Sequence, residues 1–453
     1  MDEAYYWGWA QSFEFGYFSK PPMIAWLIML TSQLFGDASP LAVKSGALLV
    51  YPLTTLVIFL LARELFSEKV GFAAALTFLT LPVVGFSSII VSTDVLLFLC
   101  WVSGIYFFRL ALDRNSLWFW VLAGIAGGVG LLTKYTMIIF PISAALFLVT
   151  SEQCRNELKK PGFYIALGVA VLVFMPNIIW NFLHDFPTVR HTAQISELDQ
   201  ELFNPLSMIV FLLEQVYVFG PILFGIFVYL LARPNIWWAD ARFRMLFFFA
   251  VPFLAVITLQ SLLARAHGNW GAPTYVAATI FVVGYLIQKA HWKTLYAAIA
   301  VNLLLTLLPY HFQQLSRVLD LDLAATPDPY VEVKGWGQFG DSLEVALSQH
   351  PNAKLLSSER PLLAQAIYQV KPHPFDAVLW NPQRIINNHY AITTTMDDKV
   401  GKDFVFVTTD SYPQEVLSRF SQVARKPDII INRHPYPETH FYLYFLQGFS
   451  GYE

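Results

Sequence analysis

The chain has 453 residues, of which 56% are hydrophobic and 13% are charged. Soluble globular proteins carry about 25% charged residues, so this composition excludes an ordinary soluble protein and indicates an integral membrane protein. The net charge of −3 argues against a nucleic-acid partner, and two cysteines are too few for a disulfide framework or a structural zinc site.

The first 41 residues form a segment of their own, rich in aromatic side chains. Pro21-Pro22 leads from this aromatic stretch into an apolar run. We expect two short helices, over residues 3–13 and 21–35, with Ser19 capping the second. A bilayer-spanning helix needs about 20 residues, so both helices should lie on the outer face of the membrane.

Ten apolar runs of near-spanning length follow this segment. Several contain proline or glycine, which transmembrane helices tolerate where neighbouring helices or a cavity satisfy the freed backbone groups. We therefore expect a polytopic α-helical bundle over residues 42–310 with about ten transmembrane helices. The runs cover residues 42–62, 70–90, 94–112, 117–133, 135–150, 163–180, 206–232, 244–263, 271–288 and 293–310.

The distribution of lysine and arginine between the loops predicts the orientation of the bundle, because cytoplasmic loops carry an excess of both. The richer set of loops should be cytoplasmic, which leaves residues 1–41, the loops at 181–205 and 264–270, and the region after 310 on the outer side. The richer set holds Arg63, Lys69, Arg109, Arg114, Arg155, Lys159, Lys160, Arg233, Arg242, Arg244, Lys289 and Lys293, against Lys20, Lys44, Lys134, Arg190 and Arg265 in the other.

With this orientation the chain begins outside the membrane without a signal peptide. We therefore expect a further transmembrane helix upstream of residue 1. The alternative is unaided translocation of a short acidic N-terminus.

Polar and charged residues return after about residue 311, where amphipathic segments alternate with short β-like runs. This alternation predicts a small extracytoplasmic α/β domain over residues 311–453. It contains no glycine-rich nucleotide-binding motif. The expected strands are 353–357, 377–380, 389–394, 403–408, 428–432 and 441–446, and the expected helices are 341–349, 361–368 and 413–424.

Two acids and a lysine in the first segment require an explanation, because charge close to lipid is costly. Asp2 and Glu3 are either a solvated terminal pair or the site of a general base, a role that needs a carboxylate within reach of a hydroxyl. Lys20 is either a lysine that extends to the membrane surface or a point charge for a phosphate group.

Further charges on the same predicted side could complete a site. Asp94 begins a predicted span and is either an acid favoured by the helix dipole or a second site acid that converges with Asp2. Lys134 lies between two apolar runs with almost no loop around it, which favours a paired functional role. The last outer loop contains Arg265 and His267, either of which could bind an anion.

These outer-face acids and bases above a lipid-accessible bundle suit a lipid-phosphate-linked donor. The phosphate would contact lysine and arginine side chains, the polyprenyl tail would lie in a groove facing lipid, and the acceptor hydroxyl would lie near Asp2. No cofactor is expected. A divalent metal is compatible with this chemistry, but the sequence contains no pattern that indicates one.

The motifs that carry these charges occur in an order found in a known family. They are Asp2-Glu3-Ala4-Tyr5-Tyr6, Tyr17-Phe18-Ser19-Lys20-Pro21-Pro22 with Trp26, Ser92-Thr93-Asp94, Leu132-Thr133-Lys134-Tyr135, Pro176-Asn177 with Trp180-Asn181, and Asn269-Trp270 with Pro273. As a set, over about residues 1–310, they resemble the bacterial branch of the dolichyl-phosphate-mannose protein mannosyltransferase family. This family lies within the GT-C membrane glycosyltransferases, to which the lipid A aminoarabinose transferase is related.

The resemblance implies an inverting transfer of a sugar from a polyprenyl-phosphate donor to a hydroxyl of lipid A, core saccharide, polysaccharide or protein at the periplasmic face of the inner membrane. It implies that Asp2 activates the acceptor, supported by Glu3, that Asp94 is a second acid at the edge of the site, and that Lys20 contacts the donor phosphate. Ser19 stands where the aminoarabinose transferases carry glutamate, so their donor preference and any metal contact do not extend to this chain.

Two other functions would use similar parts. A transporter or flippase for lipid-linked sugars would share the lipid groove and the phosphate contacts, but it would favour paired internal repeats, which the sequence does not show. A polymerase or ligase acting on polyprenyl-diphosphate chains would also use outer-face bases, so only the identity of the donor distinguishes it.

Overall fold

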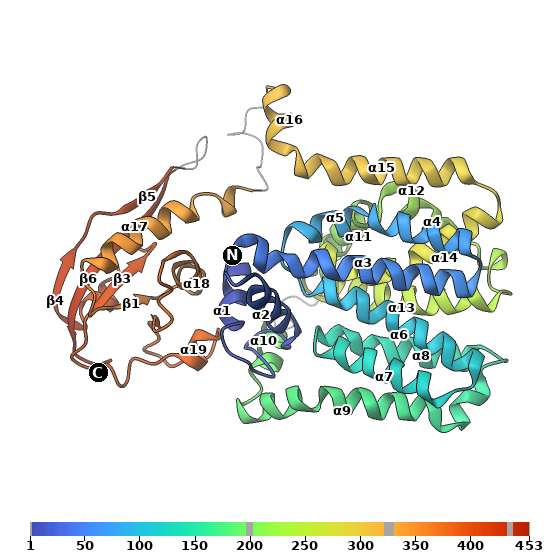
Figure 1. Cartoon of the computed structure of the whole chain (residues 1–453), viewed down its shortest axis with the longest axis horizontal. Coiled ribbons are helices and arrows are strands. Elements are labelled where there is room, and N and C mark those ends of the chain that lie inside the picture. The colour runs from blue at the N-terminus through green and yellow to red at the C-terminus, as the bar shows by residue number, and fades with distance from the viewer. Residues whose placement is uncertain (1, 196–202, 321–329, 433–437, 453) are drawn as a thin grey trace.

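The computed structural model describes residues 2–195, 203–320, 330–432 and 438–452. A bundle of long helices and a smaller α/β domain lie end to end (Figure 1). Helices α1 (Asp2–Trp9) and α2 (Met23–Phe35) lie between them. The expected architecture, a polytopic helical bundle with a C-terminal α/β domain, is confirmed.

Within the described residues, five helices are long and apolar enough to cross a membrane. They are α3 (Pro40–Leu65), α6 (Asp94–Arg114), α9 (Pro161–Leu183), α13 (Ala241–Leu263) and α15 (Trp292–Tyr310). Two bent pairs could each form one more span. These are α4 (Glu68–Leu79) with α5 (Pro82–Ile89), bent by 50°, and α11 (Pro205–Phe219) with α12 (Pro221–Leu231), bent by 117°.

In the described part of the chain all ten predicted runs are helical, and the five long helices and the two bent pairs account for seven of them. The three remaining apolar runs are helical but short: α7 (Leu117–Leu131), η1 with α8 (Tyr135–Ile138 and Ile139–Thr150), and α14 (Thr274–Gln288). Each is shorter than the roughly 20 residues that a perpendicular span requires. The hydropathy of the sequence located these apolar helices, but it did not predict the turns that make each helix shorter than its apolar run.

The sharpest of these bends occurs at Gly220. Its φ of +87° lies in the left-handed region, and a Cβ added there would lie 1.8 Å from Asn302 Oδ1. Only glycine fits this position, because a Cβ would be strained at this φ and would also clash with Asn302. Pro221 then begins α12 in a new direction, which its fixed φ and missing N–H allow at the first turn of a helix.

Lipid-facing surfaces mark the sides of the bundle. α9 and α15 lie at opposite edges in Figure 1, and only 17% of each apolar span is buried. Their exposed side chains are apolar, as at Leu172, Phe182 and Leu304. Continuous apolar surface of this extent requires a hydrocarbon environment, so the chain is a multi-pass membrane protein.

The two ends of the bundle differ as the loop charges predict. The loops rich in lysine and arginine, including those with η2 (Arg155–Lys159) and η3 (Pro234–Ile236), lie at the end remote from the α/β domain (Figure 1). The opposite end carries α10 (Pro187–Ile195), η4 (Gly268–Gly271) and α16 (Phe312–Val318). The first segment and the α/β domain thus share one end of the bundle, as expected.

The described part of the α/β domain contains a six-stranded sheet in the order β2-β1-β3-β6-β4, with β5 also pairing to β6. β1 is parallel to β2 and β3, and β6 is antiparallel to β3, β4 and β5. The strands are β1 (Lys354–Ser357), β2 (Val378–Leu379), β3 (Phe404–Thr408), β4 (Phe420–Arg425), β5 (Ile429–Ile431) and β6 (Thr439–Phe449). The helical elements are η5 (Val331–Val333), α17 (Trp336–Ser348), α18 (Arg360–Gln369), α19 (Tyr390–Thr393) and α20 (Gln414–Leu417).

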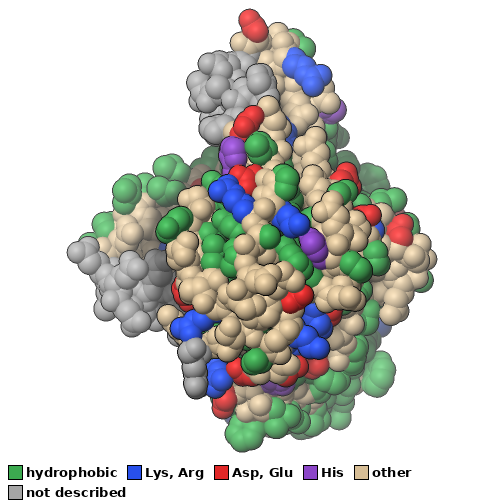
Figure 2. All heavy atoms as spheres, turned by 90° about the vertical axis from the view of Figure 1, so that its left-hand side faces the viewer, with side chains coloured by type: hydrophobic (Ala, Val, Ile, Leu, Met, Phe, Trp, Pro, Cys, Tyr) green, Lys and Arg blue, Asp and Glu red, His purple; other side chains and the backbone are tan. Residues whose placement is uncertain are grey.

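The face of this domain turned away from the bundle is polar. Figure 2 shows lysine, arginine, aspartate and glutamate side chains interspersed over it among hydrophobic and uncharged ones. This mixed charge is typical of a solvated surface rather than one that contacts lipid.

Two predicted elements of the domain are wrong. Residues 389–394 form the short helix α19 rather than a strand, because His389 and Tyr390 pack against α1, where the His389 N–H donates to the Tyr5 hydroxyl. Of the helix expected over residues 413–424, only Gln414–Leu417 is helical, and residues 420–424 belong to β4. Pairing with β6 determines that segment, so a tertiary contact overrides local preference.

A shared apolar core joins α1 and α2 to the α/β domain. It contains Tyr5, Trp9 and Ile28 from the first segment and Leu363 and Tyr390 from the domain, all less than 9% exposed. The expected cap is wrong, since the residue before α2 is Pro22 and makes no side-chain capping bond. Packing against the domain therefore holds the start of the chain in place.

Candidate functional site

Four of the predicted site residues converge on one cavity at the end of the bundle that faces the α/β domain. The cavity has a volume of about 430 Å³, and we call it the site cavity. Asp2, Lys20, Asp94 and Lys134 all line it, although they come from α1, the loop before α2, the start of α6 and the residue before η1. Segments up to 132 residues apart in sequence thus supply charges to a single space.

Asp94 and Lys134 form a buried ion pair within the site cavity. The Lys134 Nζ lies 2.7 Å from Asp94 Oδ1, and the two side chains are 15% and 1% exposed. Asn269 Nδ2 donates to Asp94 Oδ2 at 2.9 Å, and the Ser92 hydroxyl donates to the same oxygen at 3.2 Å. A charge this deep is tolerable only when it is paired and hydrogen-bonded, and both conditions hold here.

Lys20 is the free cation of the site cavity. Among the described residues, none forms a hydrogen bond or ion pair with its ammonium group. Burial lowers the pKa of Lys20, and the nearby charge of Lys134 lowers it further, while Asp94 and Asp2 act in the opposite direction. A half-buried ammonium group beside a second cation is suited to an anionic ligand, which would supply the missing counter-charge.

Asp2 lies at the rim of the site cavity and is the most exposed of the four side chains, at 61%. Its Oδ1 is 3.9 Å from the guanidinium of Arg360 at the start of α18, so the pair is loose. The carboxylate is therefore accessible, and its oxygens remain free to accept a proton.

Glu3 holds a loop and does not line the site cavity. Its Oε1 accepts a hydrogen bond from the Val91 N–H at 2.9 Å and lies 3.3 Å from Lys44 Nζ. These contacts tie α1 to the segment that precedes Asp94 and to α3. Glu3 thus fixes the start of α1, the helix that carries Asp2, and its side chain does not enter the site cavity.

The two remaining predicted anion ligands, Arg265 and His267, are not brought together with Lys20 and Lys134. Both are exposed, and Arg265 does not line the site cavity. His267 lines a neighbouring cavity of about 850 Å³, the apolar cavity, which is walled by Val83, Phe86, Val218, Leu305, Leu308 and Leu315. The two cavities share Ile90, Ser92 and Asn269 as lining residues, so they adjoin.

Several residues of the site cavity were not identified from the sequence as part of it. Tyr6 projects from α1, Gln260 from the end of α13 and His191 from α10. Burial lowers the pKa of His191 to about 4, and the charges of Lys20 and Arg360 contribute, so the imidazole is neutral at physiological pH. The Asn269-Trp270 motif drew attention to Asn269 in the sequence, but it did not predict the hydrogen bond from Asn269 to Asp94.

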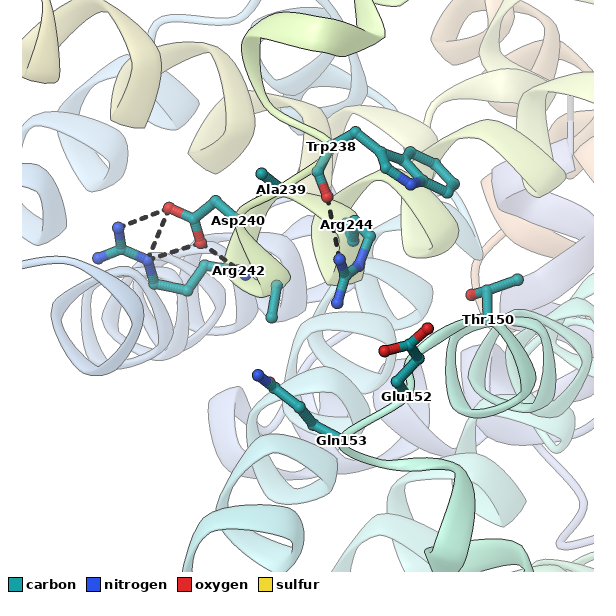
Figure 3. A pocket seen from close by; sticks show the side chains of 9 residues that line it. Thr150, Glu152, Gln153, Trp238, Ala239, Asp240, Arg242 and Arg244 are labelled. Carbon is teal, nitrogen blue, oxygen red and sulfur yellow. Dashed lines mark hydrogen bonds and ion pairs between the residues drawn. The ribbon is translucent and has the colours of Figure 1, made fainter.

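A separate polar cavity lies at the far end of the bundle. It has a volume of about 440 Å³, and Figure 3 shows Glu152 and Gln153 on one side of it and Asp240, Arg242 and Arg244 on the other. The Arg242 guanidinium donates to both oxygens of Asp240, and Arg244 Nη1 donates to the Trp238 carbonyl. These cations are engaged within the protein, and none of the predicted site residues lies there.

The described residues contain no group of three or more His, Cys, Asp and Glu side chains arranged to hold a metal ion.

Comparison with known proteins agrees with this architecture. The profile of the family described as dolichyl-phosphate-mannose-protein mannosyltransferase matches residues 19–180. Over 310 residues the chain is 34% identical to the lipid A galacturonosyltransferase RgtD of Rhizobium johnstonii, covering 68% of this chain and 64% of that protein. It is 29% identical to an undecaprenyl phosphate-alpha-4-amino-4-deoxy-L-arabinose arabinosyl transferase of Pseudomonas fluorescens over 168 residues, 35% of this chain and 30% of the relative.

Among solved structures, the fold is similar to that of ArnT from Cupriavidus metallidurans. The TM-score is 0.61 at 15% identity, with 95% of this chain and 88% of ArnT covered, both for the apo structure and for the complex with undecaprenyl phosphate. The chain spans slightly less than two thirds of the length of RgtD and about a third of the arabinosyl transferase.

Proposed function

We propose that this chain is a member of the dolichyl-phosphate-mannose-protein mannosyltransferase family with the GT-C fold, and that it is a glycosyltransferase that moves a sugar from a polyprenyl-phosphate donor to a hydroxyl acceptor. The observation that carries the proposal is the convergence of an accessible carboxylate, Asp2, with two lysines in one cavity that adjoins an apolar one. A base, a phosphate contact and space for a lipid tail are the three parts that such a transfer needs.

In the proposed reaction, Asp2 removes the proton of the acceptor hydroxyl while the oxygen attacks the anomeric carbon of the donor sugar. The bond from that carbon to the phosphate oxygen breaks, and polyprenyl phosphate leaves with the electron pair. Attack from the face opposite the phosphate inverts the anomeric configuration. Asp2 is the proposed catalytic base, Glu3 positions its helix, and Asp94 acts through Lys134.

Two lysines would bind the donor phosphate. Lys20 has no counter-ion among the described residues, and Lys134 keeps two ammonium protons after donating to Asp94. Phosphate is already a good leaving group when its charge is neutralised, so preorganised cations account for much of the stabilisation of the transition state. His267, which lines the apolar cavity, would contact the lipid side of the donor, and Arg265 lines neither cavity. We propose no resident cofactor.

The polyprenyl tail would extend from the phosphate into the apolar cavity, which opens between α5, α11, α15 and α16. In this proposal residues 1–41 supply the catalytic segment, residues 42–310 hold the donor, and the domain over residues 311–453 faces the acceptor. The excess of lysine and arginine at the remote end supports an orientation with the site on the periplasmic side of a bacterial inner membrane.

The names of the relatives suggest the substrate classes to test first. RgtD, which aligns over 310 residues, is named for galacturonosyl transfer to lipid A, whereas the arabinosyl transferases align over shorter stretches. We therefore propose a hexuronosyl donor, with lipid A or core saccharide as the acceptor, in preference to an amino-pentose donor.

A direct transfer assay tests the proposed function. Purified protein in lipid nanodiscs, given polyprenyl-phosphate galacturonic acid labelled in the sugar and lipid A, should form labelled lipid A, with and without EDTA. Label that instead crosses the bilayer of proteoliposomes while still attached to the polyprenyl phosphate would indicate a flippase. Activity with polyprenyl-diphosphate chains alone would indicate a polymerase or ligase, and either result contradicts the proposal.

The lowered pKa of Lys20 predicts a pH dependence of donor binding. The ammonium form binds phosphate, so donor affinity should be full below the pKa of Lys20 and should fall as the pH rises through it, at a pH below the ordinary lysine value of 10.5. In Lys20→Arg the guanidinium stays charged throughout this range, so the alkaline rise of the donor KM should disappear. An alkaline rise that is unchanged in Lys20→Arg would assign it to another group.

A further inference from the structure

A further polar cavity lies close to the proposed base, on the α/β domain. It has a volume of about 290 Å³ and lies outside the bundle, and we call it the asparagine pocket. None of its lining residues lines the site cavity. It is lined by Ser358, Arg360, Leu379, Trp380, Asn381, Asn387 and Asn388.

Arg360 lies between the asparagine pocket, which it lines, and Asp2 at the rim of the site cavity. Its guanidinium lies over the Tyr5 ring at 4.9 Å and is 3.9 Å from Asp2 Oδ1, while its side chain lines the asparagine pocket. The ion pair is too long for a hydrogen bond, and among the described residues Arg360 makes no other ion pair. Most of its five N–H donors therefore remain available, in a planar arrangement suited to a carboxylate or phosphate.

The three asparagines add donors and acceptors that suit hydroxyl groups. The side chains of Asn381 and Asn388 each donate one hydrogen bond and accept one within their own loop. Each amide therefore retains a second N–H donor and a second carbonyl lone pair. The amide groups are held in place by these bonds, which reduces the entropy lost when a ligand binds. Sugar hydroxyls both donate and accept, and the pocket offers both kinds of partner beside a cation.

We propose that the asparagine pocket binds the saccharide of the acceptor, and that Arg360 recognises an anionic group, a carboxylate or a phosphate, on that saccharide. This inference rests on the proposed function, because it uses Asp2 as the base. The donor phosphate needs Lys20 and Lys134, which lie in the site cavity with the apolar cavity beside it. The lining of the asparagine pocket has no such apolar extension for a lipid tail. The pocket lies on the Arg360 side of Asp2, so an acceptor bound there would present its hydroxyl to the base.

Binding of small saccharides to the full-length protein tests the pocket without requiring turnover. Glucosamine 6-phosphate and glucuronate serve as anionic probes, and glucosamine and glucose as their neutral counterparts, with affinities measured by saturation-transfer NMR in nanodiscs. The anionic probes should bind at least about tenfold more tightly than the neutral ones, the range expected for a charge-assisted hydrogen bond. Arg360→Gln should remove this difference.

Two matched variants identify where the probes bind. Arg425→Gln removes a guanidinium of the same domain that pairs with Asp428 and lines none of the cavities described above, so it should change nothing. Lys20→Met removes the free cation of the site cavity and so reports any binding of the probes there, and the preference for anionic probes that it retains should be the part that Arg360→Gln removes. Equal binding of neutral and anionic probes, or a loss in Lys20→Met instead of Arg360→Gln, would overturn the assignment.

Transfer kinetics then separate acceptor from donor. Arg360→Gln should raise the KM for lipid A by about tenfold or more while the donor KM changes by less than about twofold. Comparing lipid A with its dephosphorylated form distinguishes a phosphate from a carboxylate as the recognised group. A rise in the donor KM alone would overturn the acceptor assignment. If the wild-type protein forms no product, the proposed function fails, whereas the binding measurements still decide whether the pocket is a saccharide site.

Discussion

Replacement of Asp2 by asparagine is expected to abolish sugar transfer without unfolding the protein. Asparagine has nearly the same shape but cannot take up the acceptor proton, and a general base typically contributes about 10²–10⁴-fold to the rate. The side chain is 61% exposed and its ion pair with Arg360 is loose, so little folding energy should be lost. The rate of labelled product formation measures the effect, with the thermal unfolding midpoint as the check on folding.

Asp37→Asn is the matched control for this variant. Asp37 is also an exposed acid of the first segment, but it does not line the site cavity, and its Oδ1 accepts hydrogen bonds from Ser39, which asparagine also permits. Its activity should equal that of the unmodified protein. Near-normal turnover by Asp2→Asn would remove Asp2 from the role of base and leave Asp94 as the acid to test next.

Removing Lys134 is expected to have the largest effect on stability. In Lys134→Met the Asp94 carboxylate, 1% exposed in the intact protein, would keep only its bonds to Asn269 and Ser92 and would lose its cation. Breaking a buried ion pair from one side costs about 3–5 kcal/mol, because an uncompensated charge remains in a medium of low polarity. The unfolding midpoint should therefore fall clearly, and transfer should be lost.

The double variant Asp94→Asn/Lys134→Met separates the structural role of this pair from its catalytic role. With no charge left to bury, it should be more stable than Lys134→Met alone, and the Asn269 contact can persist. Transfer should nevertheless stay absent, because the lysine that faces the donor phosphate is gone. Recovery of activity in the double variant would show that the pair serves stability only, and an unchanged midpoint in Lys134→Met would contradict its burial.

Composition and local pattern were enough to establish the class of protein and the position of its helices. An apolar run long enough to cross a bilayer becomes a helix because lipid offers no other partner for backbone groups, so the run itself determines the outcome. The same reasoning placed residues 1–41 and the α/β domain at one end. It also selected Asp2, Lys20, Asp94 and Lys134, since charge beside lipid is costly enough to stand out in the sequence.

Only the tertiary structure decided which of these charges meet. Asp94 and Lys134 are 40 residues apart, and their 2.7 Å contact depends on how α6 packs beside the turn that leads into α8. Arg265 and His267 looked equally suitable in the sequence, yet neither lines the site cavity that contains Lys20. The directions of side chains depend on packing between helices, which local sequence does not encode.

The errors in the α/β domain have the same physical origin. Residues 389–394 became helical because of their contact with α1, and residues 420–425 became a strand because β6 was available to pair with them. That docking also brings Arg360 to within 3.9 Å of Asp2, across 358 positions of sequence. The sequence determined which chemical groups the protein has, and the packing of the domain onto the first helix decided which of them surround the proposed base.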